Sequence, residues 1–299
     1  MTNQYNRNNQ EVRFIERFDR EYPARLQDIK NPPAGIYVQG KLPDYTKKTV
    51  AMVGSRMCSA YGRSCAAEFA KIFVKHDVQI ISGMARGIDG ISQGTAAREG
   101  GATFGVLGCG IHVVYPKENE TLYYEVLRNG GLISEFHPEA PPLARQFPVR
   151  NRIISGLSDL VLVIEAEERS GTGITVQRAL EQGKDVFAVP GRVHDLYSQG
   201  CNRLISQGAG IAYSPEFVLD ALGIVRDEQK QNDIKKIFLL EKREKVVYSN
   251  LDFYAKDLET ISLSVKLPIG EVLEALFCLQ MKGLASEIGK NNYVKLQDI

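Results

Sequence analysis

The sequence predicts an α/β protein built on a doubly wound parallel sheet, and three observations support this fold class. Short apolar segments alternate with segments of helical periodicity between about residues 49 and 222. One apolar segment, LSDLVLVIEA at 157–166, is rich in β-branched residues, as expected of a strand buried on both faces of a parallel sheet. Glycine and proline separate most of these segments. Repeated strand–helix–strand units of this length are typical of right-handed crossovers within one sheet.

The order of the segments predicts the elements. Expected strands cover 49–54, 78–83, 102–108, 131–136, 157–166, 185–191 and 210–214. Expected helices cover 59–77, 89–100, 117–130, 174–183, 201–208 and 215–223. Before the buried strand, the segment PVRNR at 148–152 is interpreted as an arginine-rich turn. In such a sheet, a ligand is expected beyond the carboxyl ends of the strands.

Changes in composition divide the chain into four parts. Residues 1–45 offer only a short helix and one IYV strand, and we interpret them as an N-terminal arm or the remnant of a larger element. Residues 46–222 form the predicted sheet domain. Residues 223–235 are charged and poor in apolar side chains, which is typical of a linker. Residues 236–299 form a separate small unit.

The small unit resembles a winged helix-turn-helix in its pattern. Three helical segments precede a hairpin with a polar GKNN turn. Such a unit usually reads DNA, but its third helix carries Glu271 and Glu274, which would repel phosphate groups. Docking of another protein, or simple packing, is therefore the favoured role.

Bulk composition limits the classes of partner and compartment. The 37 basic and 36 acidic residues nearly balance, so a polyanionic partner must be met by a local patch. The five cysteines are scattered without a CxxC pair, which favours reduced thiols over disulfides or a zinc site. The polar start lacks a signal-peptide core, and no apolar run approaches membrane-spanning length. We expect a cytoplasmic protein that needs no metal and no cofactor.

Arginine and glycine occur together in the turns of one sheet edge. Arg150 and Arg152 precede the buried strand, and Ser170-Gly-Thr-Gly173 leads from it into the next helix. Forked guanidinium donors, exposed backbone amides and hydroxyl groups together suit phosphate oxygens. Phe147 and Tyr115 could stack on bases.

Common nucleotide-enzyme motifs are absent. The first turn, VGSRMCSAYG, contains no GxGxxG, and no GxxxxGK[ST] occurs anywhere in the chain. Asp89 could act as a general base, although an aspartate at this position more often caps a helix. Ser170 has no histidine or lysine nearby in the sequence to activate it as a nucleophile.

Many ordered motifs resemble those of the DNA-processing protein A family, known as DprA or Smf. They include GSR at 54–56, SGMARGID at 82–89, VLGCG at 106–110, FPVRNRII at 147–154, ALEQG at 179–183, FAVPG at 187–191 and GCNRLI at 200–205. The resemblance runs from about Tyr22 to the C-terminus. Gln93 stands where the family usually has histidine, and SGTGITV replaces the more usual SGSLITA.

The resemblance implies a non-enzymatic protein of natural transformation. Such a protein has an extended Rossmann-like domain and a winged-helix domain, protects incoming single-stranded DNA, helps load the recombinase RecA, and forms homodimers. The implied DNA-binding residues are Gly54, Ser55, Arg56, Gly83, Arg86, Gly108, Arg150, Arg152, Arg169, Ser170, Gly171 and Thr172. Among them, Arg150 and Arg152 are supports or contacts, and the amides of the four glycines are expected to hold phosphates.

One enzyme remains as an alternative. Nucleoside-monophosphate phosphoribohydrolases of the lysine-decarboxylase-like group share a similar sheet and a PGGxGTxxE turn. Their chemistry needs the terminal glutamate, but here SGTGIT is followed by Val176, Gln177 and Arg178. The sequence therefore favours DNA binding over hydrolysis.

Overall fold

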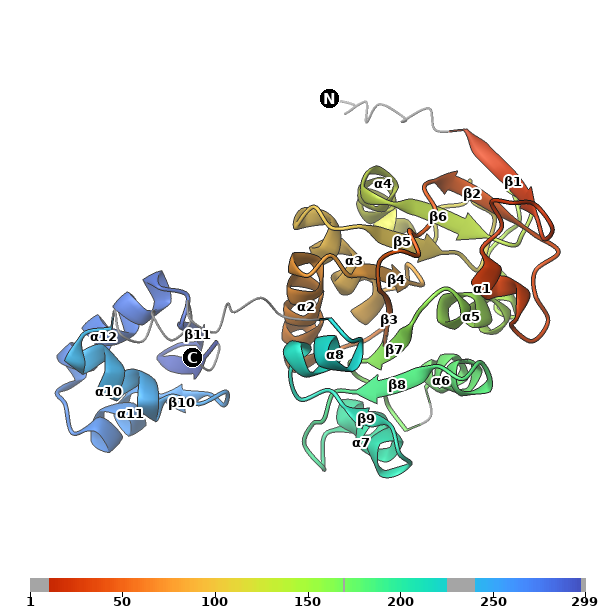
Figure 1. Cartoon of the computed structure of the whole chain (residues 1–299). Coiled ribbons are helices and arrows are strands. Elements are labelled where there is room, and N and C mark those ends of the chain that lie inside the picture. Colours follow the sequence, from red (N-terminus) through yellow and green to blue (C-terminus); the bar gives the residue numbers. More distant parts are fainter. Residues whose placement is uncertain (1–10, 169, 225–239, 297–299) are drawn as a thin grey trace. The chain divides into compact units, whose positions relative to one another are not determined.

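The computed structural model describes residues 11–168, 170–224 and 240–296. Residue contacts divide the chain into two compact units, 1–225 and 226–299 (Figure 1). Arg169 and most of the predicted linker lie outside the described residues. Within them, no helix combines the length and the apolar character needed to cross a membrane.

The described part of the larger unit contains one nine-stranded sheet in the order β1-β2-β6-β5-β4-β3-β7-β8-β9. Its strands are β1 (Val12–Glu16), β2 (Gly35–Gly40), β3 (Thr49–Val53), β4 (Gln79–Ser82), β5 (Thr103–Val106), β6 (Gly131–Ser134), β7 (Leu160–Val163), β8 (Asp185–Ala188) and β9 (Gly210–Ile211). From β6 across to β9 every neighbouring pair is parallel, whereas β1 and β2 pair antiparallel. The predicted α/β fold with a parallel sheet is confirmed.

Helices cover both faces of this sheet. They are α1 (Ala24–Gln27), α2 (Ala60–Lys75), α3 (Ile88–Arg98), α4 (Glu120–Asn129), α5 (Gln146–Gly156), α6 (Thr172–Glu181), α7 (Leu196–Ser206) and α8 (Pro215–Ala221). Alternate residues of β3 point to opposite sides. Val50 and Met52 belong to the core under α2, α3 and α8, whereas Ala51 and Val53 belong to the core under α5 and α6. Burial on both faces explains the unbroken apolar runs of these strands.

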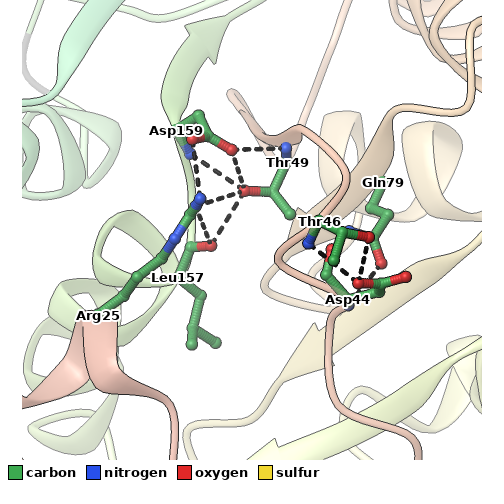
Figure 2. Close-up of polar contacts among 7 residues, drawn as sticks. All are labelled: Arg25, Asp44, Thr46, Thr49, Gln79, Leu157 and Asp159. Atoms are coloured by element: carbon green, nitrogen blue, oxygen red, sulfur yellow. Dashed lines mark hydrogen bonds and ion pairs between the residues drawn. The ribbon is translucent and has the colours of Figure 1, made fainter.

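The segment interpreted as an N-terminal arm is part of the sheet. β1 and β2 extend the sheet beyond β6, and Ile15, Leu26 and Ile36 are buried in the main core. Figure 2 shows how α1 is tied to the starts of β3 and β7: the Arg25 guanidinium donates to Asp159 Oδ1 at 2.9 Å and to Thr49 Oγ1 at 3.0 Å. The large unit therefore includes this segment.

The predicted arginine-rich turn at 148–152 is wrong, because these residues lie inside α5. Pro148 stands in the first turn of the helix, where its missing N–H leaves no hydrogen bond unmade. Arg150, Ile153, Ile154 and Leu157 are buried at helical spacing. Two arginines on the buried face interrupt the apolar pattern of this helix, so its helical periodicity is not evident in the sequence.

The smaller unit has its own core. It contains α10 (Lys242–Asn250), α11 (Leu258–Val265) and α12 (Ile269–Met281), with β10 (Lys256–Asp257), β11 (Ala285–Gly289) and β12 (Asn292–Lys295). Val247, Ile261, Val272, Leu276 and Leu279 are completely buried in it. The three helices and the hairpin occur as the sequence predicts, and β10 adds a third strand. The winged-helix assignment and its role stay predictions.

Candidate functional site

The sheet order creates a crevice between β3 and β7. From β3 the chain continues through β4, β5 and β6 in one direction, whereas β7, β8 and β9 lie on the other side. Connections at the carboxyl ends of β3 and β7 therefore diverge, which is the usual place for a ligand in an open α/β sheet. A pocket of about 560 Å³ opens at this point, and we call it the switch-point pocket. Its volume lies in the range of small-ligand sites.

The switch-point pocket unites segments that are far apart in the sequence. It is lined by the turn after β3, the first turns of α5 and α6, and Tyr115. Seven of the predicted site residues line it: Gly54, Ser55, Arg56, Arg150, Ser170, Gly171 and Thr172. Two acidic residues, Asp89 and Glu167, also contribute to the wall.

Among the described residues that line the pocket, Arg56 is the exposed cation. Its side chain is exposed, and it makes no ion pair with any other described residue. The guanidinium carbon lies 5.8 Å from the centre of the Phe147 ring, and the Tyr115 ring lies 5.5 Å from that of Phe147. Tyr115 is 44% exposed. The Arg56 guanidinium thus stands beside the Phe147 ring, which in turn lies against the ring of Tyr115.

The N-terminus of α6 supplies hydrogen-bond donors to the same pocket. No side chain among the described residues caps this helix. The amides of Gly173 and Ile174 already donate to backbone carbonyl oxygens of the same turn, at 3.1 and 3.2 Å. The amides of Gly171 and Thr172 have no acceptor among the described residues, and the helix dipole favours an anion at this end. A Cβ atom at Gly171 would meet no other atom within 4 Å. No described neighbour would clash with a side chain at Gly171. The space that a side chain would fill is therefore open to a ligand.

Arg150 forms the buried floor of the pocket. It is 4% exposed and donates to the carbonyl oxygens of Gly83, at 2.9 Å, and Val106. Burial lowers the pKa of Arg150 to about 10, so the group stays charged at neutral pH. Burial also raises the pKa of Asp89, and the nearby Arg150 charge and backbone hydrogen bonds only partly oppose it.

Asp89 does not have the role of helix cap that the sequence favoured for it. Gly87 is the N-cap of α3, and the Asp89 carboxylate accepts the Gly83 amide at 3.1 Å. The carboxyl is also 7% exposed. It belongs to the support beneath the pocket.

Other predicted site residues lie outside the lining. The amide of Gly83 already donates to Asp89, which makes it unavailable to a phosphate and corrects that expectation. A Cβ at Gly108 would lie 2.6 Å from the Phe147 ring, so this glycine makes room for the ring. Arg86 is exposed and paired with Glu118.

Arg152 is a structural support. Its two terminal nitrogens donate to both oxygens of Glu135 at 2.7 and 2.6 Å. Its Nε donates to the Asn31 carbonyl at 2.8 Å. With 9% of its surface exposed, it ties the N-terminal segment to the end of β6 and offers little to a ligand.

Glu165 is the residue that the sequence analysis missed. It follows β7, is 1% exposed, and its carboxylate accepts the Ser59 amide at 2.9 Å and the Ser59 hydroxyl at 2.5 Å. An acidic residue at the end of an apolar strand usually indicates that the chain reaches the solvent there, so the sequence suggests an exposed side chain at this position. Its one local signal is that the apolar run continues into Ala166.

The described residues contain no group of three or more His, Cys, Asp or Glu side chains that could hold a metal ion. The described lining of the pocket offers guanidinium, amide, hydroxyl, carboxyl and aromatic groups.

Comparison with known proteins gives one consistent family. Residues 13–223 match the family described as DNA recombination-mediator protein A. DNA processing protein DprA of Bacillus subtilis is 39% identical over 214 residues, covering 71% of this chain and 72% of that protein. Protein Smf of Escherichia coli is 43% identical over 202 residues, covering 67% of this chain but only 54% of that protein.

Solved structures agree with the sequence relatives. DNA processing protein A from Streptococcus pneumoniae superposes with a TM-score of 0.66 at 38% identity, covering 71% of this chain and 74% of that one. The Helicobacter pylori protein, whose structure describes a single-stranded DNA binding mode, gives a TM-score of 0.64 at 26% identity, covering 72% and 96%. The chain therefore belongs to the DNA recombination-mediator protein A family, the DprA and Smf proteins.

Proposed function

We propose that the protein binds single-stranded DNA in the switch-point pocket and has no enzymatic activity of its own. The observation that carries this proposal is the exposed Arg56 beside the uncapped N-terminus of α6 and the rings of Phe147 and Tyr115. A phosphate would lie between the guanidinium and the helix amides, and a neighbouring base would stack on the rings. The single-stranded DNA binding described for the Helicobacter pylori relative supports the same choice of ligand.

Sequence preference should be weak, because phosphate contacts position a strand without reading its bases. We further propose a cytoplasmic homodimer that protects incoming DNA during natural transformation and helps load RecA. Family membership supports these roles. Gel shifts with single- and double-stranded oligonucleotides of equal length, with and without RecA, would test them. Failure to retain the single strand would overturn the proposal.

Arg56→Ala is expected to weaken binding of single-stranded DNA by roughly 10- to 100-fold, because a charge-assisted hydrogen bond contributes about 1.5–3 kcal/mol. The loss should be equal for oligo(dT) and oligo(dA). The salt slope should become shallower by about 0.7, the value for one phosphate on a single strand. Fluorescence anisotropy titrations at several salt concentrations measure both quantities.

Arg128→Ala is the matched control for Arg56→Ala. Arg128 is also exposed, but it lies in the last turn of α4 and does not line the pocket. Its removal should leave affinity and slope unchanged. Equal affinities for both variants would exclude Arg56 as a phosphate contact.

Tyr115→Ala is expected to weaken binding by about 1–3 kcal/mol, the contribution of stacking one base on an aromatic ring. Since no charge is removed, the salt slope should stay at the wild-type value. Tyr213→Ala, which removes another exposed ring outside the pocket lining, provides the control. A Tyr115→Ala variant that binds normally would argue against stacking at this side chain.

The phosphoribohydrolase alternative gains no support from the site. In α6, SGTGIT is followed by Val176, Gln177 and Arg178, and none of these is the glutamate that this chemistry needs. Adenine release on incubation with AMP is the observation that would reopen this alternative.

A further inference from the structure

Glu165 forms hydrogen bonds with both ends of the turn that carries Arg56. At one end, its carbonyl oxygen accepts the Ser55 amide at 2.8 Å. At the other end, its carboxylate accepts the Ser59 amide at 2.9 Å and the Ser59 hydroxyl at 2.5 Å. Arg56 lies between these two anchors. Glu165, which follows β7, thus contacts the turn both where it leaves β3 and where it enters α2, while the Ser55 hydroxyl bonds to the Met57 backbone within the turn.

The carboxylate also occupies the N-terminus of α2. A Cβ atom at Gly62, in the first turn of this helix, would lie 2.1 Å from Glu165 Oε2, so only glycine leaves space for the carboxylate. In a mononucleotide-binding fold, the end of the helix that follows the first strand is the usual place for a ligand phosphate. Here the Ser59 hydroxyl caps the helix by accepting the Gly62 amide at 3.1 Å, and the Glu165 carboxylate that accepts from Ser59 lies at that position. The uncapped N-terminus of α6 is left for a ligand.

We propose that Glu165 is a positioning residue for Arg56: its carboxylate takes the phosphate position at α2 and holds the turn so that the guanidinium faces the N-terminus of α6. This inference rests on the proposed function, because it concerns how the same pocket receives a DNA phosphate. This role explains why a glutamate, only 1% exposed, lies close to a site proposed for an anion. The carboxylate is fixed by hydrogen bonds from Ser59 and does not face the ligand.

A double-mutant cycle on the full chain tests this role. Glu165→Ala is expected to weaken binding of oligo(dT) by a factor close to that of Arg56→Ala, roughly 10- to 100-fold, and to make the salt slope equally shallow. The double variant should bind no more weakly than Arg56→Ala alone, because a residue that acts through Arg56 has nothing left to position. Wild-type affinity for Glu165→Ala, or independent losses that multiply in the double variant, would overturn the inference.

Glu165→Gln separates hydrogen bonding from charge. A glutamine can accept the Ser59 amide through its oxygen and donate to the Ser59 hydroxyl through its nitrogen. It is therefore expected to keep wild-type affinity. A carboxylate that acted directly on the ligand would repel its phosphate, so tighter binding by Glu165→Gln would show that the charge itself acts on the ligand. A loss as large as that of Glu165→Ala would show that the hydrogen bonds with Ser59 do not account for the effect. Either outcome refutes positioning.

Gly62→Ala provides a second route if Glu165→Ala does not fold. The added methyl group must displace the carboxylate while every charge of the protein is kept. Reduced affinity with a shallower salt slope is expected, and unchanged binding would contradict the proposal. Circular dichroism and the thermal midpoint verify folding of each variant. If the parent chain does not retain oligo(dT), the proposed function fails, and if Arg56→Ala binds normally, Arg56 is no phosphate contact. A normal Glu165→Ala beside a weakened Arg56→Ala refutes only the positioning role.

Discussion

Arg150→Ala is expected to lower the free energy of unfolding by about 3–5 kcal/mol, the usual loss when one partner of a buried charged network is removed. The 4% exposed guanidinium donates to the carbonyls of Gly83 and Val106. Without it, both oxygens lose a donor, and the buried Asp89 loses its nearby positive charge. For a unit of this size, the midpoint of thermal unfolding should fall by roughly 6–20 °C.

Arg145→Ala is the control for this experiment. Arg145 stands immediately before α5 and is exposed, so its removal should change stability by no more than about 0.5 kcal/mol. Calorimetry on both variants and on the parent chain measures the difference. Adding Asp89→Asn to Arg150→Ala should recover part of the lost stability, because the amide that replaces the buried carboxyl cannot ionise. Equal midpoints for Arg150→Ala and Arg145→Ala would show that the buried contacts contribute little.

The parallel part of the sheet was predictable from local patterns. Strands buried on both faces must be apolar at consecutive positions, and β3, β4 and β7 therefore stand out in the sequence. The role of β2 was not predictable, because it depends on antiparallel pairing with β6, as in the partnership of Tyr37 with Ser134. Such pairing joins residues that are far apart in the chain, and no local sequence pattern predicts it.

The sequence predicted which turns lie together, but not which of their side chains are buried or paired. Arg56 and Gly171 each follow a strand of the parallel sheet, and the carboxyl ends of such strands share one edge. Whether an arginine of these turns is exposed or buried depends on partners that lie far from it in the sequence. Arg152 is paired by Glu135, and Arg150 is buried against Gly83, so neither burial follows from the spacing of the RNR segment. The sequence pattern predicted that these turns share one edge of the sheet, and only the three-dimensional contacts separate exposed side chains from structural supports.

Asp159→Ala is expected to lower the free energy of unfolding by about 2–3 kcal/mol, because it leaves charged and neutral donors without their acceptor. The Asp159 carboxylate accepts from the Arg25 guanidinium at 2.9 Å and from both the amide and the hydroxyl of Thr49 at 2.8 Å (Figure 2). These contacts join α1 to the starts of β3 and β7. Loss of the carboxylate should therefore also loosen the N-terminal segment, measurable as faster amide hydrogen exchange in α1.

The stability that Asp159 provides should depend on pH with a definite sign. Burial by itself would raise the pKa of Asp159, but the hydrogen bonds from Arg25 and Thr49 outweigh it and hold the pKa below the ordinary value of about 3.9. The folded state then binds a proton less readily than the unfolded state. The contribution is complete above the ordinary value and is lost as the pH falls through the lowered pKa.

Urea unfolding of Asp159→Asn and the parent chain tests this dependence. Their difference in stability should be largest near neutral pH and should shrink as the solution is acidified below about pH 4. Asp185→Asn, at the exposed start of the neighbouring strand β8, should show no such convergence. A difference that stays constant across this range would mean that the carboxylate acts through its shape and hydrogen-bonding capacity, with no contribution from its charge.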